Sequence, residues 1–325
     1  MQRELINRAR ELLADGTVDR VLGWQAGQFV YDITPAVFTD AGELEAHFVY
    51  NEFCADNLSK YLIKESEKEG KVLAFLKPCD TYSFNQLVTE HRIRREHVYV
   101  IGVESYGKAD VEKLRARGIS GITGVETVSG MLKVHTMYGD ESVPLNEVML
   151  DRCLTCKSKK HVVYDELIGE DGDVVADSGR FDMVEKLERM TAKERFSFWQ
   201  GELSRCIRCN ACRNVCPACT CENCVFDNPG SGLQNRAARD DFEEKLFHII
   251  RAYHVAGRCT DCGECSRVCP EHIPLHLLNR KFIKDFNELY GPFQAGEVSG
   301  QMSPMCAYTE TADPEASVVR KGGAE

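Results

Sequence analysis

The chain has 325 residues, of which 43% are apolar, and a formal net charge of -11. That length and apolar content suffice for two domains with proper cores. The acidic balance excludes a general nucleic-acid binder, because affinity for phosphate rests on clustered lysine and arginine. No apolar run approaches the roughly 18 residues that a membrane-spanning helix requires, which argues against direct membrane insertion.

Sixteen cysteines are the most unusual feature of the composition. The N-terminal segment MQRELINRARELLADGTV is charged and amphipathic and lacks the apolar run of a secretory signal. We therefore expect a cytoplasmic protein. In such a reducing compartment, clustered thiolates indicate metal ligands rather than disulfides.

Residues 1–188 are predicted to form the first domain, because helical and strand patterns alternate there and only four cysteines occur. Short apolar strands are predicted at 72–76 and 97–103. Asp80 is predicted to be the N-cap of a helix between these strands. Together the three elements give a β-α-β crossover of ordinary length.

Further helices of this domain are predicted to end at Gly70 and at Gly118, since glycine is the usual residue just beyond a helix. The segment 130–140 alternates polar and apolar residues between glycines, as an antiparallel strand does. The predicted fold is therefore an α/β domain with a mixed sheet and flanking helices.

Residues 189–297 are predicted to form a second, mainly α-helical domain. Thr191 and Glu194 have the spacing of a capping box at the start of a helix. Another helical pattern covers 240–257. Residues 298–325 lack periodicity and are small and polar, which predicts a flexible tail.

Two cysteine runs in the second domain share the spacing C-x-x-C-x-x-C-x-x-x-C, and proline follows each of them. The runs are Cys206, Cys209, Cys212 and Cys216, and then Cys259, Cys262, Cys265 and Cys269. This spacing is typical of bacterial ferredoxins, in which three thiolates of a run bind one 4Fe-4S cluster and the fourth binds the other. It predicts a ferredoxin-like 4Fe-4S dicluster domain with crossed ligand sets: Cys206, Cys209, Cys212 and Cys269 for one cluster, and Cys216, Cys259, Cys262 and Cys265 for the other. The alternative of two zinc sites would use only two C-x-x-C pairs and leaves the third cysteine of each run without a role.

A third candidate site begins with the pair Cys153 and Cys156, whose C-x-x-C spacing suits redox chemistry, zinc or an iron–sulfur cluster. Cys79 stands where a helix begins, and the helix dipole there favours a thiolate. Taken alone, Cys79 and Cys54 are each also compatible with a buried apolar role. Together the four cysteines complete a ligand set for a third 4Fe-4S cluster.

Cys219, Cys221 and Cys224 follow the first run directly with the spacing C-x-C-x-x-C. They are candidate ligands of a fourth cluster, replacement ligands, or contacts to a partner protein. Cys306 is the candidate fourth ligand, but its place in the tail favours a free thiol. The sequence contains no glycine-rich nucleotide motif, and the scattered histidines indicate no further metal site.

Three segments in this order carry a resemblance to a known family: VLAFLKPCDTYSFNQL, VYVIGV and LDRCLTCKSKKHVVYDELIGEDGD. They resemble the β-subunit family of coenzyme F420-dependent hydrogenases and dehydrogenases, which includes formate dehydrogenase β subunits, over roughly residues 15–180. The resemblance implies FAD and a 4Fe-4S cluster. It places Asn57, Lys77 and Thr81 near the flavin, and the third candidate site at the adjoining cluster.

The chain departs from the usual pattern of that family, because its two-cluster module is C-terminal instead of N-terminal. This module is similar to those of heterodisulfide-reductase-associated electron carriers. We therefore expect an electron-transfer subunit of an anaerobic hydrogenase, formate dehydrogenase or heterodisulfide-reductase-type complex, in which a flavin and clusters exchange electrons. The alternatives are a flavin-free iron–sulfur conduit and a zinc-stabilised interaction protein.

Overall fold

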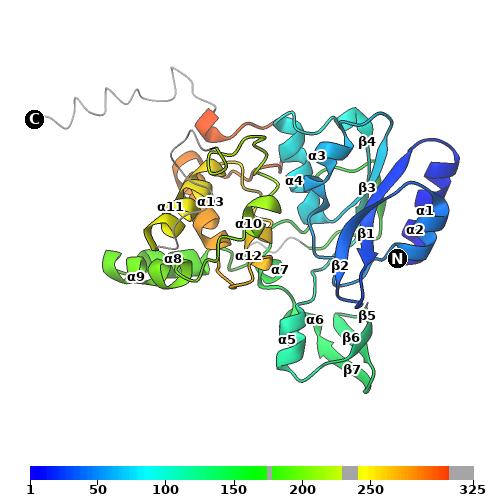
Figure 1. Cartoon of the computed structure of the whole chain (residues 1–325), viewed down its shortest axis with the longest axis horizontal. Helices are drawn as coiled ribbons and strands as arrows, with labels where there is room; N and C mark the ends of the chain where they lie inside the picture. The colour runs from blue at the N-terminus through cyan, green and yellow to red at the C-terminus, as the bar shows by residue number, and fades with distance from the viewer. Residues whose placement is uncertain (174–177, 229–240, 307–325) are drawn as a thin grey trace, which may run out of the picture.

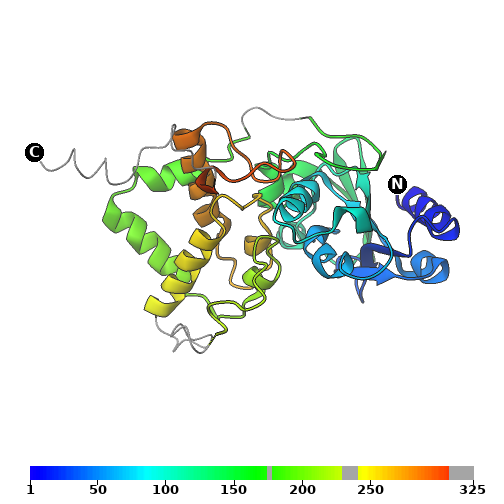
Figure 2. The same ribbon diagram turned by 90° about the horizontal axis from the view of Figure 1, so that it is seen from above.

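A computed structural model describes residues 1–173, 178–228 and 241–306, and the side chains of all of these except 241–244. The chain forms an α/β part, a small separate sheet beneath it, and a helical part beside it (Figure 1). The α/β and helical parts also lie side by side when viewed from above (Figure 2). Within the described residues, no helix has the length and apolar character needed to cross a membrane.

The main sheet has five strands in the order β2-β1-β3-β4-β8. They are β1 (Arg20–Ala26), β2 (Ile33–Phe38), β3 (Val72–Leu76), β4 (Val98–Val103) and β8 (Glu166–Ile168). β2 pairs antiparallel with β1, and the other pairs are parallel. Every residue of β3 is buried, as its unbroken apolar sequence predicts for a parallel strand covered on both faces. The predicted mixed sheet with flanking helices is confirmed.

Helices cover both faces of this sheet (Figure 1). On one face lie α1 (Gln2–Ala14) and α2 (Ala41–His47); on the other, toward the helical part, lie α3 (Leu62–Glu65) and α4 (Pro78–Thr89). The predicted crossover is confirmed as β3-α4-β4, with the short helix η2 (Arg95–His97) before β4. The N-cap prediction for Asp80 is wrong, because Lys77 is the N-cap. Asp80 instead stands in the first turn, where its carboxylate accepts the Lys77 N–H at 3.2 Å.

The helix predicted to end at Gly70 is replaced by the short pieces η1 (Leu58–Lys60) and α3. Arg20 on β1 contacts this segment. Its guanidinium donates to the carbonyl oxygen of Glu65 at 2.7 Å and to that of Glu69 at 2.9 Å. These contacts hold the end of α3 and the chain after it against β1 instead of in one continuous helix.

The segment predicted as an antiparallel strand lies outside the main sheet. It belongs to a separate antiparallel sheet of β5 (Ile122–Val128), β6 (Met131–Thr136) and β7 (Gly139–Pro144). Helices α5 (Val111–Ala116) and α6 (Leu145–Val148) pack on it through a small apolar core. The predicted helix end near Gly118 is confirmed, since this glycine follows α5 with a φ of 82°.

Apart from β8, the remaining regular elements of the described residues are helices joined by long loops. These helices are α7 (Asp151–Leu154), α8 (Asp182–Arg189), α9 (Ala192–Leu203), α10 (Ala211–Asn214), α11 (Asp241–His254), α12 (Glu264–Arg267), α13 (His276–Tyr290) and η4 (Pro304–Cys306). The capping box of Thr191 and Glu194 at the start of α9 is confirmed. The expected domain boundary at residue 188 falls inside α8, whose apolar side packs on α13. The expected tail is described as far as Cys306, which is exposed; the remainder lies outside the described residues.

Candidate metal centres

The two cysteine runs share the same backbone conformation. In the first run Arg208 and Asn210 have φ values of 54° and 61°, and in the second run Asp261 and Gly263, at the same positions, have 59° and 68°. A left-handed conformation is uncommon for residues with a side chain. Left-handed residues alternating with right-handed ones turn successive N–H groups inward, which makes the concave anion sites found at phosphate and iron–sulfur centres. A short helix then begins at the same position of each run.

Backbone N–H groups of these loops point toward cysteine sulfurs. The Arg208 N–H lies 3.4 Å from the Sγ of Cys206. In the second run, burial raises the pKa of Cys259, and a hydrogen bond from the backbone of Asp261 acts against this rise. In both runs, the backbone N–H two residues after the first cysteine is therefore directed at the sulfur of that cysteine. Such donors favour the thiolate, which is the form that binds iron.

One small cavity, of about 20 Å³, is lined by four cysteines that come from both runs. They are Cys206, Cys209, Cys212 and Cys269. These are the first three thiols of one run and the fourth of the other, as in the crossed ferredoxin pattern. The imidazole of His248 also lines this cavity, with its Nε2 3.2 Å from the Sγ of Cys206.

The other four thiols of the runs also lie near one another. Burial raises the pKa of Cys262, and the neighbouring Cys216 and Cys259 raise it further. Burial likewise raises the pKa of Cys265 to about 11, with Cys216 again adding to the effect. Because metal ions bind the deprotonated thiolate, cluster assembly at this site must release protons.

The arrangement of the cysteines distinguishes between 4Fe-4S clusters and single zinc ions. All sixteen cysteines are free of disulfides. Within the described part of the chain, no three His, Cys, Asp or Glu side chains are close enough to hold a single ion. The ligands of a 4Fe-4S cluster bind different irons and lie farther apart than those of one ion. Four thiols per site, with N–H groups directed at sulfur, fit 4Fe-4S clusters better than tetrahedral zinc.

Three of the four remaining N-terminal cysteines lie near one another. Burial raises the pKa of Cys79, and the neighbouring Cys156 adds to this rise. Burial also raises the pKa of Cys156, with Cys153 as the next cause. Cys54 lies in the core of the main sheet, where its Sγ accepts the Asn51 N–H at 3.3 Å. A third cluster on these four cysteines stays a prediction, with Cys54 the least suited member.

The three cysteines after the first run have different surroundings. A hydrogen bond from the thiol of Cys219 lowers the pKa of Cys216 to about 5, against the effect of burial. Cys221 is exposed, and Cys224 is half-buried. Cys219 and Cys221 line a cavity of about 630 Å³ that also includes Lys60. Cys219 thus supports a ligand of the second set, and a fourth cluster stays a prediction.

Comparison with known proteins adds to this geometry. Residues 202–273 match the family model described as a 4Fe-4S dicluster domain. The F420-dependent formate dehydrogenase subunit beta of Methanocaldococcus jannaschii is 24% identical over 84% of this chain and 86% of its own. The F420-dependent formate dehydrogenase 1 subunit beta of Methanococcus maripaludis is 23% identical over 66% of this chain and 71% of its own. The chain is thus similar to F420-dependent formate dehydrogenase β subunits over most of its length, and its C-terminal part matches a 4Fe-4S dicluster domain. A chain of the F420-reducing NiFe hydrogenase complex of Methanosarcina barkeri aligns with 47% of this chain and 58% of its own, at 15% identity and a TM-score of 0.38.

The residues expected near a flavin are buried and already bound to protein groups. Asn57 Nδ2 donates to Ser83 Oγ at 2.9 Å, and Lys77 Nζ donates to Asp80 Oδ2 at 2.8 Å. The hydroxyl of Thr81 donates to a backbone carbonyl of α4 at 2.7 Å. These three side chains do not fit as direct flavin ligands, so FAD would need other contacts.

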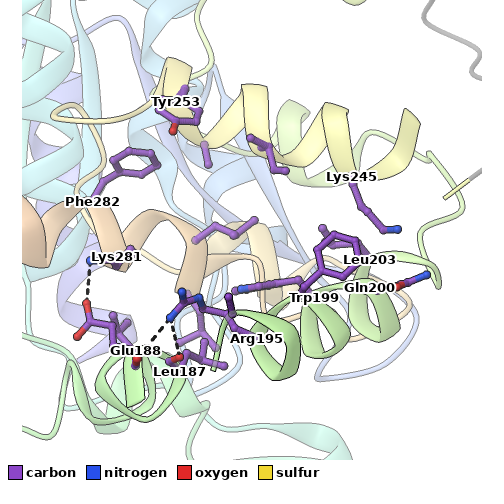
Figure 3. A pocket seen from close by; sticks show the side chains of 17 residues that line it. Leu187, Glu188, Arg195, Trp199, Gln200, Leu203, Lys245, Tyr253, Lys281 and Phe282 are labelled. Atoms are coloured by element: carbon purple, nitrogen blue, oxygen red, sulfur yellow. Dashed lines mark hydrogen bonds and ion pairs between the residues drawn. The ribbon is translucent and has the colours of Figure 1, made fainter. Parts of the chain in front are cut away.

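A more open groove, of about 760 Å³, lies between α8, α9, α11 and α13 (Figure 3). Trp199, Tyr253 and Phe282 contribute to its apolar walls, and Lys245 stands at one end. No cysteine is among its lining residues. This groove is a feature of the helical surface and not part of the candidate metal centres.

Buried ion pairs around the second run could not be recognised from the cysteine spacing. Asp261, between two cysteines, is paired with Arg180 at 2.7 Å and with Arg280 at 2.8 Å. Burial acts to raise the pKa of this carboxyl, but the two arginines outweigh it and lower the pKa. The only sequence signal is the presence of acidic residues between the cysteines of TDCGEC.

Glu264, also between cysteines of the second run, connects the helical part to the α/β part. Its carboxylate is fully buried and forms ion pairs with Arg152 and Arg267. Arg152 of α7 also donates to the carbonyl of Cys262 at 2.7 Å and to that of Ala55 at 2.6 Å. The residue that precedes Cys153 thus contacts the second cysteine run directly.

Proposed function

We propose that this chain is the iron–sulfur electron-transfer subunit of an oxidoreductase complex. The observation that carries the proposal is the matching backbone of the two cysteine loops, which directs N–H groups at sulfur. The similarity to formate dehydrogenase β subunits supports a place in such a complex. A mainly helical, ferredoxin-like domain at 189–297 is part of this proposal.

The proposed ligands of the two clusters are the crossed sets Cys206, Cys209, Cys212 and Cys269, and Cys216, Cys259, Cys262 and Cys265. A 4Fe-4S cluster bound at each set would supply reversible one-electron transfer. The protein buries Cys212, Cys216 and Cys265 and so limits access of water to their sulfurs. Solvent exposure and hydrogen bonds to sulfur are the means by which a protein adjusts cluster potential.

The surroundings of the two cysteine runs support a different electron-transfer contact for each run. The second run faces the α/β part, where the hydroxyls of Thr260 and Ser83 lie 2.8 Å apart. In the first run Cys209 is exposed, and the side chain of Ile207 is 52% exposed. We assign exchange with the α/β part to the second run and exchange with a partner to the first.

Two candidate functions differ in the role of the α/β part. The family resemblance supports FAD there and a partner of the hydrogenase, formate dehydrogenase or heterodisulfide-reductase type in the cytoplasm. The hydrogen bonds that Asn57, Lys77 and Thr81 already make to protein groups favour the second candidate, a flavin-free conduit. Denaturing the anaerobically purified protein distinguishes them, because the first candidate releases FAD and the second releases none.

Iron analysis tests the cluster proposal. Anaerobically purified protein is expected to contain about eight iron atoms or more per chain, with matching sulfide. Cys212→Ser and Cys265→Ser, one in each set, should lower the iron content, whereas Cys306→Ser should not. Two zinc ions per chain with little iron would contradict the proposal.

A double variant tests the third candidate site. Replacing Cys153 and Cys156 with alanine should remove about four iron atoms and leave the signals of the two dicluster sites in place. An unchanged iron content would mean that these cysteines, with Cys54 and Cys79, are structural thiols.

A further inference from the structure

A buried arginine lies between the two crossed cysteine sets. Arg251 is on α11, the helix that joins the two runs, and is 4% exposed. One end of its guanidinium donates to the carbonyl of Cys212 at 3.1 Å. Its Nε–H is also buried and has no hydrogen-bond partner among the described residues. The side chain therefore has a donor left over in a place that excludes water.

The groups near Arg251 that can carry a negative charge are mainly cysteine thiols. They belong to Cys216, Cys265, Cys212 and Cys219. No carboxylate is among these neighbours. Removing an ion from water costs several kcal/mol even after the protein relaxes, so a buried guanidinium needs a compensating negative charge. The cysteine thiolates, and what they bind, are the main source of such charge at Arg251.

The thiols that face Arg251 belong to different sets. Cys265 is in the second set, and its thiol forms a hydrogen bond with the Arg251 side chain. Cys212 is in the first set, and its carbonyl accepts from the Arg251 guanidinium at 3.1 Å. One guanidinium therefore acts on both proposed clusters at once.

The same face of α11 carries a second group near sulfur. His248 precedes Arg251 by three residues, a spacing that places both on one side of a helix. Its Nε2 lies 3.2 Å from the Sγ of Cys206. Arg251 is the member of this pair that always carries a charge, because a guanidinium stays protonated in proteins.

We propose that Arg251 is a shared positioning residue that raises the reduction potential of both clusters of the dicluster domain. This inference rests on the cluster ligands proposed above. A cluster with four thiolates becomes more negative when it accepts an electron, so a fixed cation beside it favours the reduced form. Because the cation lies between the sites, both potentials should move together when it is removed.

Substitutions at Arg251 separate charge from packing. Arg251→Lys keeps the charge and loses the planar fork, Arg251→Gln keeps donors without charge, and Arg251→Met keeps only the length. Redox titrations followed by EPR would report both cluster potentials for each variant, with iron content measured alongside. Arg205→Met is the matched control, since Arg205 directly precedes Cys206 but its side chain is 44% exposed and paired with Glu202.

Arg251→Met and Arg251→Gln are expected to shift both reduction equilibria toward the oxidised form by about tenfold or more, which is 59 mV for a one-electron couple. Arg251→Lys and Arg205→Met should leave both reduction potentials close to those of the wild type. Unchanged potentials in iron-loaded variants, or a shift at one cluster alone, would overturn the inference and leave the proposed function intact. Absence of two clusters from the wild-type protein would instead reject the proposed function. If Arg251→Met fails to fold, the difference between Arg251→Gln and Arg251→Lys decides.

Discussion

The two cysteine runs have one backbone and opposite surroundings. In the second run the positions between the cysteines carry Asp261 and Glu264, each buried against two arginines. In the first run the matching positions carry Arg208 and Ala211, and Cys209 between them is exposed. The shared spacing and conformation make both loops suitable for a cluster. The side chains between the cysteines place the second loop inside the molecule and leave the first loop at the surface.

This contrast shows that metal binding and placement are specified by different residues. The cysteines and left-handed residues shape the loop locally, so the same loop can be used twice. Glu264 of the second run favours docking of this loop on the α/β part, because its buried carboxylate requires Arg152, which also contacts Ala55. Substitutions at the second run should therefore affect the joint between the two parts, and matching substitutions at the first run should not.

Removal of Arg152 should have the largest effect. Arg152→Ala leaves the buried carboxylate of Glu264 with one arginine fewer and removes hydrogen bonds to the Cys262 and Ala55 carbonyls. We expect a loss of about 3–5 kcal/mol in the free energy of unfolding, as found when one partner of a buried pair is removed. Urea unfolding of the anaerobic protein measures it. The exposed Arg117, paired with Glu147, is the control and should cost less than about 1 kcal/mol; equal losses would contradict a special role for the joint.

A side chain at Gly263 should have the next largest effect. This residue has a φ of 68°, and an added Cβ would lie 2.7 Å from the Cβ of Arg152. Gly263→Ala should cost about 2–3 kcal/mol, because left-handed strain and crowding add together. The urea midpoint measures this cost. A loss below about 1 kcal/mol would mean that the second loop can move away from α7.

The sequence predicts the local features of this molecule well. The spacing of the cysteines, the capping box at Thr191 and the apolar strand β3 are each specified by a few neighbouring residues, and the last two are confirmed. The crossed set around the small cavity also follows from spacing, although its role as a ligand set stays a prediction.

The features missed by the sequence depend on residues far apart in the chain. The pairing of Arg152 with Glu264 joins residues 112 positions apart, and no periodic pattern reports such a contact. Arg20 likewise contacts the backbone of Glu65, 45 residues later in the chain. Arg251 could not be recognised because its partners are cysteines of two separate loops.

Acid should affect the second run more than the first. His276 Nδ1 lies 2.8 Å from Ser266 Oγ in that run, and burial lowers its pKa to about 4. An unfolded histidine has a pKa near 6.5, so the unfolded state binds more protons between these values. The stability due to the neutral ring is present above about pH 6.5 and is lost as the pH falls toward 4. Urea midpoints at several pH values should show a shallower slope for His276→Gln; the same slope would assign the acid sensitivity to other groups.

The smallest effect is expected at the position of the first run that matches Gly263. Asn210 has a φ of 61°, a conformation that asparagine tolerates and glycine adopts freely. Asn210→Gly relieves the remaining strain but gives the unfolded chain more freedom, so these terms nearly cancel and the free energy of unfolding should change by about 0.5 kcal/mol or less. Urea unfolding and iron content should both stay close to those of the wild type. A loss similar to that of Gly263→Ala would show that the first loop is also packed against a neighbour, and the contrast between a surface loop and an internal loop would no longer hold.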